Sequence, residues 1–124
     1  MNAVNWFEIP ANNFERAVTF YETILNANLH RQTVDDQPNA IFPYTQNEGI
    51  GGSVIPSSDV QPVSAGAMVY MNAQTPDNLD QILSRVEAAG GTIVRPKTSL
   101  GPIGFMAMIR DVEGNLVGLH TPAL

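Results

Sequence analysis

Two side chains of this sequence are candidates for a general acid or base, the carboxylate of Glu8 and the imidazole of His120. Glu8 lies two positions after Trp6, the only tryptophan of the chain, in a segment that predicts a strand. An indole beside a carboxylate displaces part of its water, and desolvation raises the pKa of a carboxyl group towards that of a useful base. The alternatives are a solvated or arginine-paired Glu8, an exposed His120 near the chain end, and a Trp6 that packs in the core.

Other polar side chains give weaker signals of chemistry. Ser53 occurs in the segment GIGGSVI, which predicts a strand and not the strand-to-helix turn that exposes a nucleophilic serine. His30 follows the first predicted helix, where it is expected to complement the negative end of the helix dipole. Because the chain contains no cysteine, a thiol nucleophile, a disulfide and a thiolate metal site are excluded.

The composition describes one small acidic domain. The chain has 124 residues, of which 44% are hydrophobic and 15% charged, enough for one core and too few for two. Its net charge is −6 and its six basic residues are scattered, so no basic stripe is available for the phosphates of a nucleic acid. No apolar stretch approaches the roughly 18 residues of a membrane span. We therefore expect neither nucleic acid nor membrane as a partner, and take the cytoplasm as the default location.

Two amphipathic helices are predicted, one in each half of the chain. Apolar residues recur at helical spacing within residues 14–25, after Asn12 or Asn13 as the N-cap. They recur within residues 79–89, which precede the helix-ending pair Gly90-Gly91. A shift of 65 positions superposes the two helices and also the later strands, which indicates an internal repeat.

The remaining segments predict strands, so that each half has the order βαβββ. The last two strands are joined by a turn with the sequence Asp-Val-Glu-Gly-Asn, residues 111–115. We expect a single domain with modules at about 1–57 and 64–124 and a linker at about 58–63. The expected strands are residues 4–9, 29–34, 40–44, 51–55, 67–71, 92–95, 105–109 and 116–120.

Three segments carry a resemblance to a known superfamily. FEIPANNFERAVTFYETIL has the superfamily's opening order of strand, short polar turn and helix, and VEAAGGTIVRP and RDVEGNLVGLHTP match its second half. On these segments, which span nearly the whole chain, the protein resembles the glyoxalase/bleomycin resistance/extradiol dioxygenase (vicinal oxygen chelate) superfamily. The resemblance implies an α+β fold in which two βαβββ modules form a curved-sheet cleft, and it implies a homodimer. Whether the cleft closes within one chain or across the dimer stays open.

The same resemblance assigns metal ligands of metal-using members to the first and fourth strands. The corresponding residues are Trp6, Ser53, Gly118 and either Ala67 or Met68. None of them offers the imidazole or carboxylate that a divalent ion of this kind needs. We therefore expect no metal and no cofactor.

The predicted function is metal-independent binding of a small molecule in this cleft. Strand alternation puts Glu8 on the face of Trp6 and His120 on the face of Gly118, so Glu8 and His120 are the catalytic candidates of a lyase- or isomerase-like enzyme. Residues 98–105 form a loop that is a candidate lid, or a plain hairpin connection. The alternative functions are non-catalytic sequestration of a drug or metabolite and a metal-dependent lyase or dioxygenase. The expected substrate-binding residues are Trp6, Ser53, Ile55, Tyr70, Phe105 and Gly118.

Overall fold

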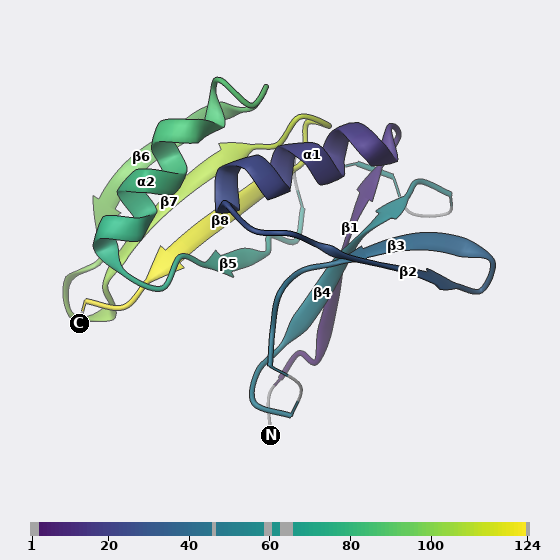
Figure 1. Cartoon of the computed structure of the whole chain (residues 1–124). Coiled ribbons are helices and arrows are strands. Elements are labelled where there is room, and N and C mark those ends of the chain that lie inside the picture. The colour runs from purple at the N-terminus through teal and green to yellow at the C-terminus, as the bar shows by residue number, and fades with distance from the viewer. Residues whose placement is uncertain (1–2, 46, 59–60, 63–65, 124) are drawn as a thin grey trace.

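The computed structural model describes residues 3–45, 47–58, 61–62 and 66–123, which form two four-stranded sheets and two helices (Figure 1). Sheet A, from the first half of the chain, has the strand order β1-β4-β3-β2, and sheet B, from the second half, has the order β5-β8-β7-β6. In each sheet the first and fourth strands of the half run parallel and the other neighbours run antiparallel. The predicted α+β fold with two βαβββ halves is confirmed. The elements are β1 (Trp6–Ala11), α1 (Phe14–Leu25), β2 (His30–Val34), β3 (Gln37–Ile41), β4 (Gly51–Pro56), β5 (Tyr70–Asn72), α2 (Pro76–Val86), β6 (Thr92–Ser99), the 3-10 turn η1 (Gly101–Ile103), β7 (Phe105–Arg110) and β8 (Leu116–Thr121).

Both helices begin at residues that cap them. The Asn13 side chain accepts a hydrogen bond from the backbone N–H of Arg16, and the Thr75 hydroxyl accepts one from the N–H of Asn78, both at 3.1 Å. These bonds satisfy N–H groups that the first helical turn leaves unpaired. α1 ends at Asn26, which takes a left-handed conformation with φ 50°. Within the described residues, no helix is long and apolar enough to cross a bilayer.

A tight turn moves β3 from its predicted place. Asp35 and Asp36 both have positive φ, 52° and 61°, as in a two-residue type I′ hairpin turn. β3 therefore begins at Gln37 and ends at Ile41, whereas the sequence predicted a strand at 40–44. As a result, Tyr44 lies in the connection from β3 to β4.

The two halves are related by two offsets and not by one. The N-caps of the helices are 62 positions apart, as are Glu8 and Tyr70, which hold equivalent places beside the fourth strands. Their fourth-strand neighbours, Ser53 and Gly118, are 65 apart. Compared with β2, β6 has two extra residues at bulges and a longer connection to the next strand, which increases the offset. In the opposite sense, the connection from β3 to β4 is longer than that from β7 to β8. The predicted 65-residue register is right for the fourth strands and wrong for the first strands and the helices.

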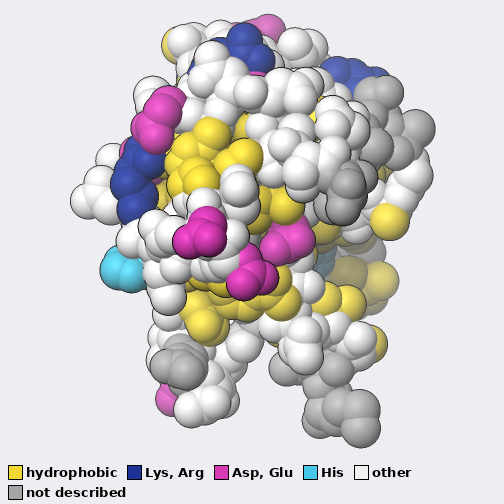
Figure 2. All heavy atoms as spheres, turned by 90° about the vertical axis from the view of Figure 1, so that its right-hand side faces the viewer, with side chains coloured by type: hydrophobic (Ala, Val, Ile, Leu, Met, Phe, Trp, Pro, Cys, Tyr) yellow, Lys and Arg dark blue, Asp and Glu magenta, His cyan; other side chains and the backbone are white. Residues whose placement is uncertain are grey.

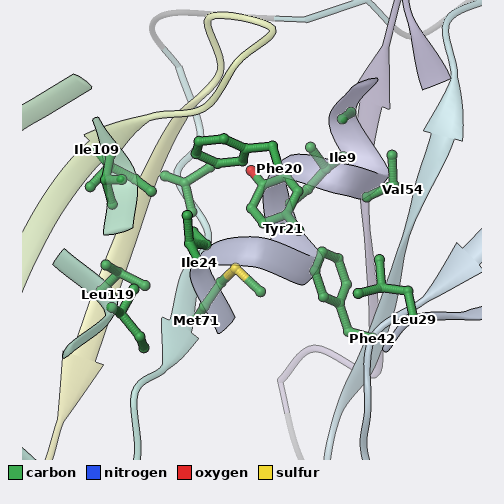
Figure 3. Close-up of a cluster of buried hydrophobic side chains, with 14 of the residues drawn as sticks. Ile9, Phe20, Tyr21, Ile24, Leu29, Phe42, Val54, Met71, Ile109 and Leu119 are labelled. Carbon is green, nitrogen blue, oxygen red and sulfur yellow. The ribbon is translucent and has the colours of Figure 1, made fainter. Parts of the chain in front are cut away.

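Helix α1 lies between the two sheets. Figure 3 shows Ile109 and Leu119 of sheet B on one side of this helix and Ile9 and Val54 of sheet A on the other, and all four belong to one buried core. Each sheet thus turns one face, here called its inner face, towards the helices. Because side chains alternate along a strand, the intervening residues lie on the opposite, outer face, which points away from the core.

The turn between β7 and β8 joins the two halves of the chain. The carboxylate of Asp111, a residue only 3% exposed, accepts hydrogen bonds from the Tyr21 hydroxyl at 2.7 Å and from the backbone N–H groups of Glu113 and Asn115 at 2.9 Å. The Asn115 side chain donates to the carbonyl of Pro10 at 3.0 Å. Burial and the nearby Asp111 charge raise the pKa of the Tyr21 hydroxyl well above its usual value. We call Tyr21, Asp111, Glu113 and Asn115 the turn latch.

Glu113 of the turn latch also caps α1. Its side chain, 1% exposed, accepts hydrogen bonds from the backbone N–H groups of Asn12 and Asn13 and pairs with Arg16 at 2.7 Å. Burial raises the pKa of this carboxyl, but the hydrogen bonds and the Arg16 charge outweigh burial and leave the pKa below its usual value. The positive end of α1 is thus matched by a carboxylate from the other half of the chain.

Candidate functional site

The outer face of sheet A brings Glu8 and Trp6 together. Glu8 is paired with Ser53 of β4, which lies opposite Ile41 of β3, and Trp6 is paired with Gly51. Glu8 is the only acidic residue in the strands of this sheet. Its side chain is exposed, and no hydrogen bond or ion pair joins it to another residue of the described ranges. The carboxylate is therefore open to a ligand.

Next to Glu8, the rings of Trp6 and Tyr44 meet edge to face over Gly51. Their centroids are 5.8 Å apart and their planes make an angle of 79°. A Cβ atom on Gly51 would lie 2.8 Å from the Tyr44 ring and 2.9 Å from the Trp6 ring, so glycine is required for both rings to lie against the strand. Trp6 is 36% and Tyr44 42% exposed, and the pair presents aromatic surface to solvent. Figure 2 shows solvent-exposed hydrophobic side chains (yellow) next to acidic side chains (magenta) on the sheet A side of the molecule.

Ser53 and Ile55 continue this face along β4. Ser53 is buried, and its hydroxyl donates to Oδ1 of Asn39 at 3.1 Å. Because the hydroxyl is 0% exposed and no base lies beside it to activate it, this hydrogen bond joins β4 to β3 within the sheet and Ser53 does not fit the role of a nucleophile. Ile55 is half-buried and adds apolar surface.

The outer face of sheet B repeats the ring-on-glycine arrangement. Tyr70 is paired with Gly118 of β8, and its ring fills the space that a Cβ atom on Gly118 would need. Met108 lies on the other side of Gly118, with Arg95 beyond it on the edge strand β6. Tyr70 is 49% exposed, so this face also offers an aromatic ring to solvent.

His120 lies on the same outer face, between Asn72 and Met106. Its Nε2 is 3.1 Å from the carbonyl oxygen of Ile103 in η1. Because a carbonyl oxygen only accepts, this hydrogen bond needs a proton on Nε2, and Nδ1 is the nitrogen that remains to accept from a ligand. The predicted lid, residues 98–105, is thus attached to His120 and exposes the apolar side chains of Leu100 and Ile103.

Phe105 lies on the inner side of sheet B, which corrects its predicted place among the substrate-binding residues. The ammonium group of Lys97 is 4.9 Å from the centroid of its ring and 3.1 Å from the carboxylate of Asp80 on α2. Alternation along β7 gives the outer face to Met106 and Met108 instead.

Within one chain the two acid/base candidates are not brought together. Glu8 is on the outer face of sheet A and His120 on the outer face of sheet B, with α1 and the core between these sheets (Figures 1 and 3). Two shallow surface hollows run along α1, away from both outer faces. Their lining residues are Thr19, Glu22, Thr23, Asn26, Ala27 and Asn28 for one and Asn13, Glu15, Arg16, Thr19, Phe20, Thr23, Ala88 and Ala89 for the other.

The residues at the positions that the resemblance assigns to metal ligands do not fit a divalent ion. The helix offset of 62 makes Met68 the counterpart of Trp6, and the fourth strands supply Ser53 and Gly118. These are an indole, a thioether, a hydroxyl and a hydrogen, without the carboxylate or imidazole ligands that such an ion takes. Over the ranges that the structure describes, no three His, Asp or Glu side chains gather at a place that could hold a metal ion.

Sequence reasoning missed Tyr44 and Asn39 as residues of the site on sheet A. The predicted third strand, residues 40–44, left out Asn39, whereas β3 begins at Gln37 and ends before Tyr44. A signal for the ring pair was present in the glycines at the start of β4, since glycine in a strand often marks the close approach of another group. The ring of Tyr44 then follows from its place just before that strand.

Comparisons with known proteins agree with this fold. Among solved structures, the chain is similar to a glyoxalase/bleomycin resistance protein from Albidiferax ferrireducens T118 (17% identity, 97% of this chain and 98% of that chain covered, TM-score 0.72). It is also similar to hypothetical protein SA1046 from S. aureus (22%, 98% and 98%, 0.67) and to the fosfomycin resistance protein FosX from Listeria monocytogenes (14%, 100% and 94%, 0.68). No curated protein sequence matches the chain. The family model described as Glyoxalase/Bleomycin resistance protein/Dioxygenase superfamily matches residues 3–119. The chain therefore belongs to the glyoxalase/bleomycin resistance protein/dioxygenase superfamily.

Proposed function

We propose that this protein binds an organic small molecule between the outer face of sheet A and the outer face of sheet B of a second copy, without a resident divalent metal. The observation that carries the proposal is the exposed aromatic surface on both faces, Trp6 with Tyr44 over Gly51 and Tyr70 over Gly118. Ligand sites combine such apolar walls with a few polar groups, and Glu8 and His120 supply these groups here.

The directions of the two faces support the proposed homodimer. A single copy offers two open walls on opposite sides of its core, and a cleft needs two walls that face each other. A two-fold axis that sets sheet A against the partner's sheet B also sets sheet B against the partner's sheet A, so all four walls are covered. Pairing sheet A with the partner's sheet A would leave both Tyr70 rings open to water.

Binding is the first proposed function and catalysis the second, because Glu8 and His120 of one chain lie on different sheets and cannot act together. In the proposed dimer, Glu8 of one copy and the partner's His120 line the same cleft, with Nδ1 of the imidazole available. That arrangement favours an acid/base enzyme of the lyase or isomerase type as the second candidate function. A metal-dependent reaction is disfavoured by the residues at the metal positions.

The proposal is tested by light scattering, metal analysis and binding on the purified chain. We expect a dimer, less than stoichiometric divalent metal by mass spectrometry, and quenching of the Trp6 fluorescence by small aromatic compounds that persists in EDTA. A chain that stays monomeric while it binds such compounds would contradict the two-copy cleft. Stoichiometric metal whose removal abolishes binding would contradict metal independence.

A further inference from the structure

Resting on the proposed binding surface, we infer that the sheet A wall recognises an organic cation through the rings of Trp6 and Tyr44 and the carboxylate of Glu8. The cation is a quaternary ammonium or a positively charged nitrogen heterocycle. The inference adds a ligand class to the proposed function and does not depend on whether the bound molecule is then transformed.

The geometry suits a ligand of this size. Trp6 and Glu8 are two residues apart on β1 and share its outer face, so their Cβ atoms are separated by roughly 7 Å. A cation is attracted to an aromatic face within about 6 Å of the ring centroid. One planar cation can therefore lie against the Trp6 ring with its charge turned towards the Glu8 carboxylate.

Gly51 allows the rings of Trp6 and Tyr44 to pack directly against the backbone of β4. Any larger residue at this position would push the Trp6 and Tyr44 rings away from β4, since a Cβ atom would already lie within 2.9 Å of both. The two rings hold each other edge to face, which limits the side-chain freedom that a ligand would have to restrict on binding.

The charge on this wall is negative, because no arginine or lysine of the described residues forms an ion pair with Glu8. Arg31, the only arginine or lysine in the strands of sheet A, is engaged with Glu15 of α1, at 2.8 Å for both guanidinium nitrogens. On sheet B, Arg95 lies on β6, the edge strand farthest from Tyr70 in the order β5-β8-β7-β6. An unpaired carboxylate beside aromatic rings attracts cations and repels anions.

An organic cation fits this wall better than a metal ion does. A divalent metal ion takes several oxygen or nitrogen ligands and holds its water tightly, and Glu8 provides one carboxylate. A quaternary ammonium or heterocyclic cation is weakly hydrated, and aromatic faces with one carboxylate are the surroundings that recognise it.

The test compares 1-methylquinolinium with its neutral isostere 1-methylnaphthalene, by calorimetry and by Trp6 fluorescence on the full chain at low salt. We expect the cation to bind about tenfold more tightly than the isostere. In Glu8→Gln this preference falls by about threefold to fivefold, while the affinity for 1-methylnaphthalene is unchanged. Trp6→Leu keeps apolar bulk and lowers the affinity for the cation by about tenfold in calorimetry.

The matched control is Glu87→Gln, which removes the same charge from an exposed position at the end of α2. It should leave the preference unchanged, and circular dichroism shows that each variant is folded. Equal binding of both compounds in the native chain, or an equal loss of preference in Glu87→Gln, overturns the cation inference and leaves the proposed binding surface intact. If neither compound binds or quenches Trp6, both the inference and the proposed function fail.

Discussion

The turn latch makes a quantitative prediction for Tyr21→Phe. The Tyr21 hydroxyl is fully buried and donates to the Asp111 carboxylate at 2.7 Å. A buried hydrogen bond to a charged group contributes roughly 1.5–3 kcal/mol. The carboxylate keeps its hydrogen bonds from the backbone of Glu113 and from Asn115, so its charge is not left without partners. We therefore expect the free energy of unfolding to fall by about 2 kcal/mol at pH 7.

The same substitution should change how stability depends on alkaline pH. The pKa of Tyr21 is raised in the folded state, so the native protein holds this proton at pH values where the unfolded chain has lost it. The contribution of Tyr21 to the free energy of unfolding is fully present below about pH 10, the ordinary pKa of tyrosine. It is lost as the pH rises above this value, by up to about 1.4 kcal/mol per pH unit. Tyr21→Phe has no such proton. Its stability deficit relative to the native chain should therefore shrink between pH 9 and 11.

The assay is urea unfolding followed by far-ultraviolet circular dichroism at pH 7, 9, 10 and 11. Tyr44→Phe is the control, because Tyr44 is exposed and its hydroxyl makes no hydrogen bond within the described ranges. Its stability curve should run parallel to that of the native chain. A deficit of Tyr21→Phe that stays constant up to pH 11 would refute the reasoning, since it would mean that Tyr21 ionises as easily in the folded protein as in the unfolded one.

Three further predictions concern the other part of the latch and the proposed cleft. Glu113→Gln should lower the free energy of unfolding by about 1 kcal/mol at pH 7. In this variant the urea midpoint of unfolding should also depend less steeply on pH below about pH 5. The native contribution, from a carboxyl with a lowered pKa, is present above about pH 4.5 and is lost as pH falls. Gly118→Val should move the Tyr70 ring into solvent, with a stability change below about 1 kcal/mol in urea unfolding and about tenfold weaker 1-methylquinolinium binding in calorimetry. Trp6→Ala and Tyr70→Ala chains refolded together in equal amounts should regain about a quarter of the native number of binding sites, because each mixed dimer has one intact cleft; no recovery would mean that the cleft closes within one chain.

Much of the fold was accessible from the sequence because local patterns decide it. Local sequence patterns are enough to predict the apolar face of α1 and its N-cap at Asn13. They are also enough to predict the alternation that puts Trp6 and Glu8 on one face of β1. The position of β3 was missed because Asp-Asp forms its hairpin turn here, where Asn-Gly is the stronger signal. The single repeat offset failed because bulges in β6 and connections of unequal length change the spacing without a mark in the hydrophobic pattern.

Contacts between residues far apart in the sequence were less accessible, in the turn latch and next to the predicted site. Asp111 and Glu113 were identified as part of a turn, but their hydrogen bonds to Tyr21 and to the start of α1 span about ninety to a hundred positions. Phe105 was counted among the substrate-binding residues as part of the candidate lid, but it packs against the core on the inner face of β7, where the ammonium group of Lys97 lies over its ring. Such long-range pairings have no signature in a single sequence.

The aromatic rings occupy the positions that the resemblance assigns to metal ligands. Trp6 holds the first-strand position that the family resemblance assigns to a ligand, and Tyr70 covers Gly118, which holds a fourth-strand position of that set. A glutamate in place of Gly118 would need the space that the Tyr70 ring fills, and a small ligand in place of Trp6 would remove the larger ring of the Trp6–Tyr44 pair. Aromatic surface and metal coordination are therefore competing uses of the same positions. Because a glycine lies under the rings on both sheets, the side chains present favour a site that holds its ligand by aromatic contact.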